Sequence, residues 1–105
     1  MTPEGEIKRE VDRILDNCPV PCWYFKPVQS GYGKRALDYI ACIGGFFVAI
    51  ETKAPGKEPT PYQRITSVDM LLAGGRVWCI TSVEGVAAFR RWVHSLPAKP
   101  HGATP

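Results

Sequence analysis

Two acidic residues and a lysine stand where a β-hairpin would bring them together. Gly44-Gly45 separates two apolar segments, and a glycine pair in that position predicts a two-residue hairpin turn. The register set by such a turn places Asp38 directly opposite Glu51. Opposed residues point to the same face of a sheet, with β-carbons about 4.5–5.5 Å apart. Lys53, two residues beyond Glu51, shares that face because side chains alternate along a strand.

Such a pair of carboxylates predicts a metal site. Their neighbours on the two segments are mainly apolar, so the two charges would repel strongly without a compensating cation. A site with oxygen ligands and open positions suits Mg²⁺, with Mn²⁺ able to substitute. Lys53 could then hold or activate a water molecule and neutralise charge that develops on a phosphate. The alternative is an ordinary surface cluster at two strand ends, which a register shift of one residue would separate.

The rest of the chain predicts the elements that position this hairpin. Hydrophobic periodicity and turn residues indicate the order α-β-β-β-α-β-α: a helix from Thr2-Pro3 to Asn17, strands at 22–29, 37–43 and 46–53, a helix from Thr60 to Gly74, a strand at 76–81 and a helix from Ser82 to Pro97. The hairpin strands are apolar on both faces, so we expect them at the centre of the sheet, covered on each side. The fold class is α/β, with a mixed four-stranded sheet flanked by helices.

Length and composition fit one small globular domain. The chain has 105 residues and a formal net charge of +3. A charge of this size alone does not indicate a nucleic-acid-binding protein. We expect a domain over residues 1–96 and a disordered tail over 97–105. No apolar run approaches the roughly 20 residues that span a bilayer. No leader segment opens the chain, so we expect no membrane partner and a cytoplasmic location.

The cysteines and tryptophans have structural interpretations. Cys18 and Cys22 could begin a zinc site, but Cys42 and Cys79 stand alone and a closed site needs four ligands. Buried free thiols in a reducing compartment are the better interpretation. The three tryptophans lie in strongly predicted elements and are expected in the core; they are Trp23, Trp78 and Trp92.

The residues around the hairpin carry a family resemblance. Asp38, twelve intervening residues and then Glu51-Thr52-Lys53 resemble the PD-(D/E)XK nuclease motif. With the Glu4-Gly5-Glu6-Ile7, Gln29-Ser30-Gly31 and Thr60-Pro61-Tyr62-Gln63-Arg64 segments, the chain resembles VRR-NUC (virus-type replication-repair nuclease) domains, relatives of archaeal Holliday-junction resolvases. Leu37 stands before Asp38, where the family usually has proline. That departure affects the local backbone rather than the chemistry.

The resemblance implies a restriction-endonuclease-like core and roles for particular residues. Asp38 and Glu51 would bind Mg²⁺, with the Thr52 carbonyl as a further ligand and Lys53 positioning the attacking water. Glu4 would complete the metal shell, directly or through water. Helical periodicity turns Glu4 toward the sheet and Glu6 toward solvent. Gln63 matches a family glutamine near the active site, although it also has the spacing of a capping box with Thr60.

The resemblance also implies a substrate. We expect a Mg²⁺-dependent endodeoxyribonuclease that acts on structured DNA such as Holliday junctions or flaps, works as a homodimer, and serves DNA repair or phage DNA processing. The DNA contacts would come from a basic loop and two later cations: Ser30, Tyr32, Lys34, Arg35, Lys57 and Arg64. The alternatives are an inactive DNA-binding module of the same fold and a sequence-specific restriction-type endonuclease.

Overall fold

The computed structural model describes residues 2–28 and 36–98, and these form a four-stranded sheet with three helices. The elements are α1 (Pro3–Asp16), β1 (Cys22–Phe25), β2 (Tyr39–Ile43), β3 (Phe46–Thr52), α2 (Pro61–Leu72), β4 (Arg76–Ile80) and α3 (Val83–Ser95). Their order is the predicted one. The strands lie in the order β1-β2-β3-β4, antiparallel except for the parallel β3–β4 pair. No helix in the described part of the chain is long and apolar enough to cross a membrane.

A tight turn between β2 and β3 sets the register of the sheet. Gly44 and Gly45 both have positive φ, 58° and 87°, as a type I′ hairpin turn requires. Ile43 pairs with Phe46, and the ladder continues to Tyr39 opposite Ile50. The predicted register is therefore confirmed, and the strand pair points Asp38 and Glu51 at each other.

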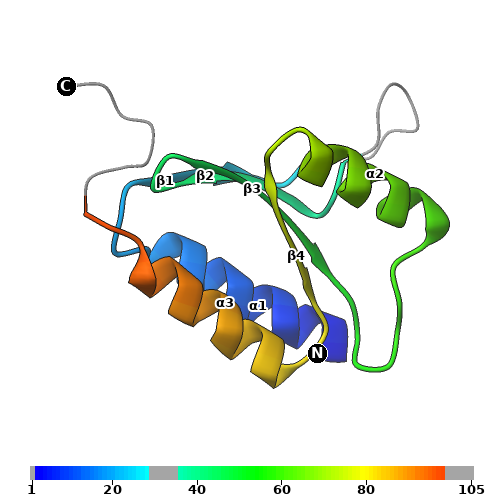
Figure 1. Ribbon diagram of the computed structural model, residues 1–105. Coiled ribbons are helices and arrows are strands. Elements are labelled where there is room, and N and C mark those ends of the chain that lie inside the picture. The colour runs from blue at the N-terminus through cyan, green and yellow to red at the C-terminus, as the bar shows by residue number, and fades with distance from the viewer. Residues whose placement is uncertain (1, 29–35, 99–105) are drawn as a thin grey trace.

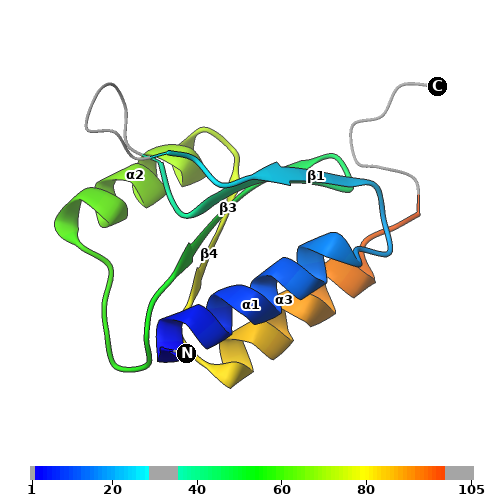
Figure 2. The ribbon, with the colours of Figure 1, turned by 180° about the vertical axis from the view of Figure 1, so that it is seen from behind.

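Two helices cover one face of the sheet and the third lies on the other. Figure 1 shows α1 and α3 side by side beneath the strands, with α2 on the opposite side; Figure 2 shows the same arrangement from behind. The apolar stripe of α1 packs against the sheet through Ile7, Val11, Ile14 and Leu15. α3 contributes Val86, Phe89 and Val93 to the same core. The core is thus one layer, between the sheet and α1 with α3.

The face beneath α2 differs from the sequence expectation. Both hairpin strands were expected to be covered on each side, yet Cys42 in β2 is exposed and Phe47 in β3 is 48% exposed. Trp23 in β1 was expected in the core and is 66% exposed, whereas Trp78 and Trp92 pack against the core as expected. Apolar residues on both faces of a strand indicate that burial of both faces is favourable. They do not indicate which part of the structure covers each face.

Two smaller expectations also change. β1 ends at Phe25 instead of continuing to residue 29, because Pro27 has no N–H to donate to a strand ladder. The thiols are not buried: Cys42 and Cys79 are exposed, and Cys18 and Cys22 are half-buried. Burial raises the pKa of the Cys22 thiol to about 12, with Cys18 adding to the effect, so this thiol stays protonated near neutral pH.

A buried tyrosine ties the hairpin to α1. The Tyr39 hydroxyl donates to Asp12 Oδ1 at 2.7 Å and lies 3.2 Å from the Lys8 carbonyl oxygen. Burial, together with the Asp12 hydrogen bond, raises the pKa of Tyr39, so the phenol stays neutral. Since Tyr39 directly follows Asp38, this contact also fixes where the hairpin begins relative to α1.

Replacing Tyr39 by phenylalanine should destabilise the protein measurably. Tyr39→Phe removes the hydroxyl that joins β2 to α1, and we expect a loss of about 1–2 kcal/mol in the free energy of unfolding, measured by urea denaturation. Tyr24→Phe is the matched control, because the Tyr24 hydroxyl bonds Asp16 at the surface. A Tyr39→Phe loss no larger than that of Tyr24→Phe would contradict the proposed anchoring contact.

Candidate active site

Asp38 and Glu51 meet at the open end of the β2–β3 hairpin. Asp38 directly precedes β2 and Glu51 is the sixth residue of β3, one step beyond the Tyr39–Ile50 pair. The Asp38 carboxylate is held from the strand itself: Oδ2 accepts the Thr52 N–H at 2.9 Å and the Thr52 hydroxyl at 2.8 Å. The two carboxyl groups also lie near enough for each to shift the ionisation of the other. The structure therefore brings together the two acids that the sequence singled out.

The two acids ionise very differently. Glu51 is only 4% exposed, and burial, followed by the hydrogen bond and charge of Asp38, raises the pKa of Glu51 to about 8. Burial alone would also raise the pKa of Asp38, but hydrogen bonds from Thr52 and Glu51 lower it below its ordinary value. At neutral pH Asp38 is therefore ionised and Glu51 is largely protonated.

The pair fits a divalent cation. A cation bound between the two carboxylates would relieve the repulsion between them, as protonation of Glu51 does without it. Mg²⁺ commonly uses one or two carboxylates and keeps several waters, so Asp38 and Glu51 are the side chains that could hold it. Within residues 2–28 and 36–98, no cluster of three or more acidic, histidine or cysteine side chains is arranged to hold a metal. The other ligand positions would therefore be open to water, a carbonyl or substrate.

A cavity opens beside the pair, under the start of α2. Its volume is about 190 Å³, and it is lined by Ala36, Asp38, Glu51, Thr60, Tyr62, Gln63 and Thr66. The helix begins there because Thr60 and Gln63 form a capping box: the Thr60 N–H donates to Gln63 Oε1 at 2.8 Å, and the Gln63 N–H to Thr60 Oγ1 at 3.2 Å. Gln63 thus caps the helix, as predicted, and also lines the cavity, while its role in the reaction stays a prediction.

Lys53 supplies a positive charge next to the carboxyl pair. It follows Thr52 at the end of β3, and its N–H bonds the Ile80 carbonyl at 3.0 Å, which extends the β3–β4 ladder. Its ammonium group acts to lower the pKa of Glu51 and that of Cys79, the residue beside Glu51 on β4. Its role in stabilising charge during the reaction stays a prediction.

Glu4 is placed differently from the other candidates. It is half-buried, whereas Glu6 is exposed, as the helical periodicity predicted. Its carboxylate pairs with Lys8 at 3.3 Å and does not line the cavity beside Asp38 and Glu51. Lys8 in turn lowers the pKa of both acids of the pair. Any action of Glu4 at the metal would therefore run through water or through Lys8.

The predicted DNA contacts are only partly within the described residues. Ser30, Tyr32, Lys34 and Arg35 lie outside them. Lys57 is exposed on the loop between β3 and α2. Arg64 pairs with Glu58 at 3.2 Å, and its charge acts to lower the pKa of Cys79. The DNA contacts of Lys57 and Arg64 both stay predictions.

Sequence reasoning missed three residues near the site: Lys8, Tyr62 and Thr66. Lys8 and Asp38 line a second small cavity of about 170 Å³, together with Lys26, Pro27 and Tyr39. The spacing of Glu4 and Lys8 on α1 was the available signal for Lys8, because residues four apart share one side of a helix. Tyr62 and Thr66 carry no such signal, since their place depends on how α2 lies over the sheet.

The raised pKa of Glu51 makes the stability of the metal-free protein depend on pH. The folded state keeps the Glu51 proton up to about pH 8, while an unfolded chain loses it near the ordinary value of 4.5. Because the folded state binds more protons between these values, this contribution to stability is full below pH 4.5 and is lost as the pH rises toward 8. In EDTA, the melting temperature of wild type should fall across this window, and Glu51→Gln should flatten the decline. Glu58→Gln, a change at an exposed glutamate, should melt like wild type, and parallel curves for all three proteins would contradict the shift.

Comparisons with known proteins connect this geometry to one fold. No protein-family model matches the chain, and no curated protein matches it in sequence. Among solved structures, the chain is similar to one described as a VRR_NUC domain, with a TM-score of 0.73 and 18% sequence identity. The match covers 87% of this chain and 97% of the other, so the two agree over nearly the whole domain. Together with the α-β-β-β-α-β-α order and the mixed sheet, this similarity shows that the chain has the fold of a VRR_NUC domain.

Proposed function

We propose that this protein is a Mg²⁺-dependent endodeoxyribonuclease. The observation that carries the proposal is the Asp38–Glu51 pair: Glu51 is buried, Asp38 is half-buried and bonded to Thr52, and both line a cavity beside α2. A protein that only binds DNA has no need for two adjacent carboxyl groups that line one cavity. The VRR_NUC fold supports the same assignment, since that name denotes a nuclease domain.

The chain's own groups divide the work of phosphodiester hydrolysis. Asp38 and Glu51 would hold Mg²⁺, which when bound withdraws electrons from the phosphate and favours ionisation of a water molecule. Thr52 fixes one Asp38 oxygen through its N–H and hydroxyl, leaving the other for the metal. Lys53 would orient the attacking water or neutralise charge on the phosphate as the bond breaks. The Gln63 side chain borders the space where the scissile phosphate would lie.

We place branched DNA first among substrates. The support comes from the sequence resemblance to nucleases of replication and repair, and a homodimer would present the two sites that a two-fold junction requires. Holliday junctions and flaps are therefore the substrates to test first, and plain duplex is the reference. Cleavage that follows a base sequence instead of a branch point would favour the restriction-type alternative.

Changes at the carboxyl pair should abolish cleavage without unfolding the protein. Asp38→Asn, Glu51→Gln and Lys53→Ala should each lower the rate by at least about a hundredfold, roughly 2.7 kcal/mol in the barrier. The measurement uses end-labelled junction, flap, duplex and single-stranded DNA with Mg²⁺, Mn²⁺ or EDTA. Glu84→Gln, which alters an exposed glutamate in the first turn of α3, is the control and should cleave at the wild-type rate.

Two outcomes would contradict the proposed nuclease activity. Near-wild-type cleavage by folded Asp38→Asn protein would show that the chemistry lies elsewhere. If wild type binds these DNAs but cleaves none of them with either metal, the fold serves here as an inactive binding module.

Glu4 and Glu6 should differ in their importance for the reaction. Glu4 is half-buried beside Lys8, whose charge reaches Asp38 and Glu51, while Glu6 is exposed. At saturating Mg²⁺, Glu4→Gln should lower the cleavage rate about tenfold, equivalent to about 1.4 kcal/mol. Glu6→Gln should leave the rate nearly unchanged, and the reverse order would contradict a role for Glu4 near the metal.

A further inference from the structure

Two thiols flank the bend that joins α1 to β1. Cys18 follows the C-cap residue of α1 and Cys22 opens β1, and the chain bends at Pro19 and Val20 between them. Both cysteines are half-buried and pack against the core cluster. The reaction proposed for the acidic pair uses neither of them. They therefore form a pair of nucleophilic side chains whose role is still to be assigned.

Contacts on both sides of the bend keep the two thiols in place. Pro19 and Pro21 fix φ at about −65° at two of the three residues between the cysteines. Val20, between these prolines, is buried, and a Cβ added to Gly44 would lie 3.4 Å from its side chain. The Gly44 N–H also donates to the Pro21 carbonyl oxygen at 2.9 Å. The bend is therefore packed and hydrogen-bonded against the hairpin turn.

The two arms of the bend are in side-chain contact. The Tyr24 hydroxyl donates to Asp16 Oδ1 at 2.5 Å, which joins β1 to the last residue of α1. Tyr24 is two residues after Cys22, and Asp16 is two residues before Cys18. Side chains two apart share one face of a strand, so Cys22 points toward α1 as Tyr24 does. The two cysteines thus lie one step closer to the bend than a pair that is already in contact.

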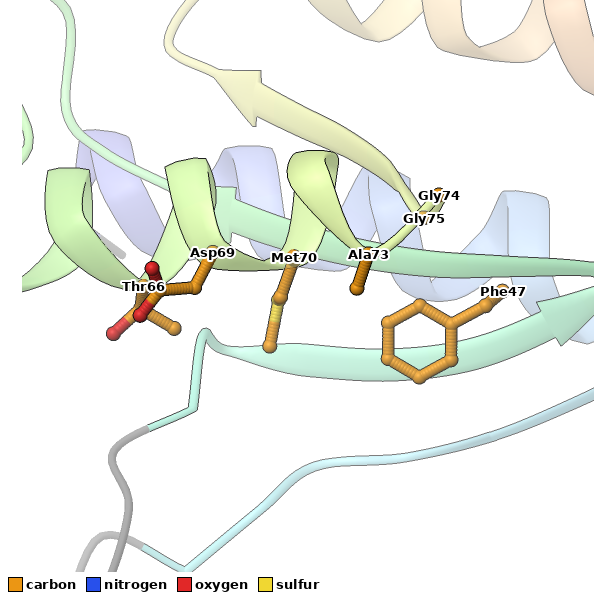
Figure 3. Close-up of a pocket in the computed structure, with 7 residues that line it drawn as sticks. All are labelled: Phe47, Thr66, Asp69, Met70, Ala73, Gly74 and Gly75. Atoms are coloured by element: carbon orange, nitrogen blue, oxygen red, sulfur yellow. The ribbon is translucent and has the colours of Figure 1, made fainter.

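Cys42 and Cys79 lie on the opposite face of the sheet. Cys42 pairs with Phe47 and Cys79 pairs with Glu51, and residues paired across strands point to the same face. Figure 3 shows the Phe47 ring on this face, where it borders a hollow beneath α2 of about 560 Å³. The sheet therefore separates these two exposed thiols from the pair at the bend.

We propose that Cys18 and Cys22 form a reversible disulfide when small disulfides, such as oxidised glutathione, accumulate. The two thiols are held at the ends of a rigid bend and face each other between α1 and β1, so the bond requires no rearrangement of either element. In a reducing compartment, disulfides of this kind form transiently in response to oxidants.

The exchange takes place in two balanced steps. The Cys18 thiolate attacks one sulfur of the small disulfide; a new S–S bond joins Cys18 to that half, and the other half leaves as a thiolate that takes up the Cys18 proton. The Cys22 sulfur then attacks Cys18 and releases the second small thiol, which takes the Cys22 proton. Two electrons pass from the protein thiols to the small disulfide. Burial, followed by the neighbouring Cys18 thiol, raises the pKa of Cys22 to about 12, so Cys18 is the thiol that attacks first.

The bridge would join the end of α1 to the start of β1 without touching the candidate active site. It lies beside the Gly44 turn, whereas Asp38 and Glu51 lie at the other end of the hairpin. Neither cysteine lines the cavity beside the acids. A disulfide stabilises a protein mainly by restricting its unfolded chain. The expected effect is therefore on stability, and the inference does not depend on nuclease activity.

Mass spectrometry of the full chain tests the bridge. The protein is equilibrated with mixtures of reduced and oxidised glutathione, and free thiols are then blocked with N-ethylmaleimide. Trypsin releases a peptide that begins at Ile14 and carries Cys18 and Cys22 but no other cysteine. As oxidised glutathione increases, this peptide should lose two hydrogen atoms and escape N-ethylmaleimide. A peptide that keeps both thiols while Cys42 and Cys79 take up glutathione, or one joined to the Cys42 peptide, would overturn the inference.

Single substitutions distinguish the bridge from ordinary thiol oxidation. Cys22→Ser should leave Cys18 joined to glutathione, because no second thiol displaces it, whereas wild type should not accumulate this adduct. Cys42→Ser is the matched control, since it makes the same change at an exposed thiol on the other face, and it should keep the bridge. Equal amounts of the Cys18 adduct in wild type and Cys22→Ser would contradict the exchange.

Thermal unfolding provides a second measurement. In a Cys42→Ser/Cys79→Ser background, oxidation should raise the melting temperature by at least about 3 °C, and dithiothreitol should reverse the rise. Adding Cys22→Ser to this background should abolish the rise. An unchanged or lower melting temperature of the oxidised protein would show that the thiols are not positioned for the bridge. Neither measurement involves DNA cleavage, so a failed bridge and a failed nuclease assay are independent results.

Discussion

The contact between the carboxyl groups of Asp38 and Glu51 depends on a turn at the far end of the same hairpin. Gly44 and Gly45 adopt positive φ angles that other residues reach only with strain, and this fixes which residues of β2 and β3 face each other. A shift of one residue would send one acid to the opposite face. The turn fixes the strand register, and the register places the two acids opposite each other. The acids themselves do not determine this pairing.

Holding two acids together has a cost that the neighbouring residues reduce. Thr52 donates twice to Asp38, so one acid stays ionised while Glu51 keeps its proton. Tyr39, next to Asp38, bonds Asp12 on α1 and ties the start of β2 to the helix layer. Similar strain and compensation are common at functional sites, where a preorganised arrangement serves the chemistry better than it serves stability.

The parts of the fold that depend on local signals could be predicted from the sequence. The hairpin register followed from the Gly44-Gly45 pair, and the start of α2 followed from Thr60 and Gln63, because turns and caps involve residues close in sequence. The exposure of Trp23 could not be predicted in this way. Apolar residues on both faces of a strand look the same whether the cover comes from the same chain or from another molecule.

The residues of the candidate site could be predicted from the sequence only where they lie on the same hairpin. Asp38, Glu51 and Lys53 lie on one hairpin, so strand alternation alone relates them. Glu4 belongs to another element, and periodicity gave its side of α1 but not its partner, which proved to be Lys8. Tyr62 and Thr66 border the cavity only because of the way α2 crosses the sheet, a packing relation between elements that sequence periodicity does not contain.

The absence of buried residues in α2 has a consequence for access to the site. A helix held by few buried contacts opens locally at a lower free energy than the rest of its domain. The wall of the cavity that α2 supplies could therefore lift from the sheet while β2 and β3 keep Asp38 and Glu51 in place. Access of substrate to the acids would then depend on the local stability of α2 and not on the stability of the whole domain.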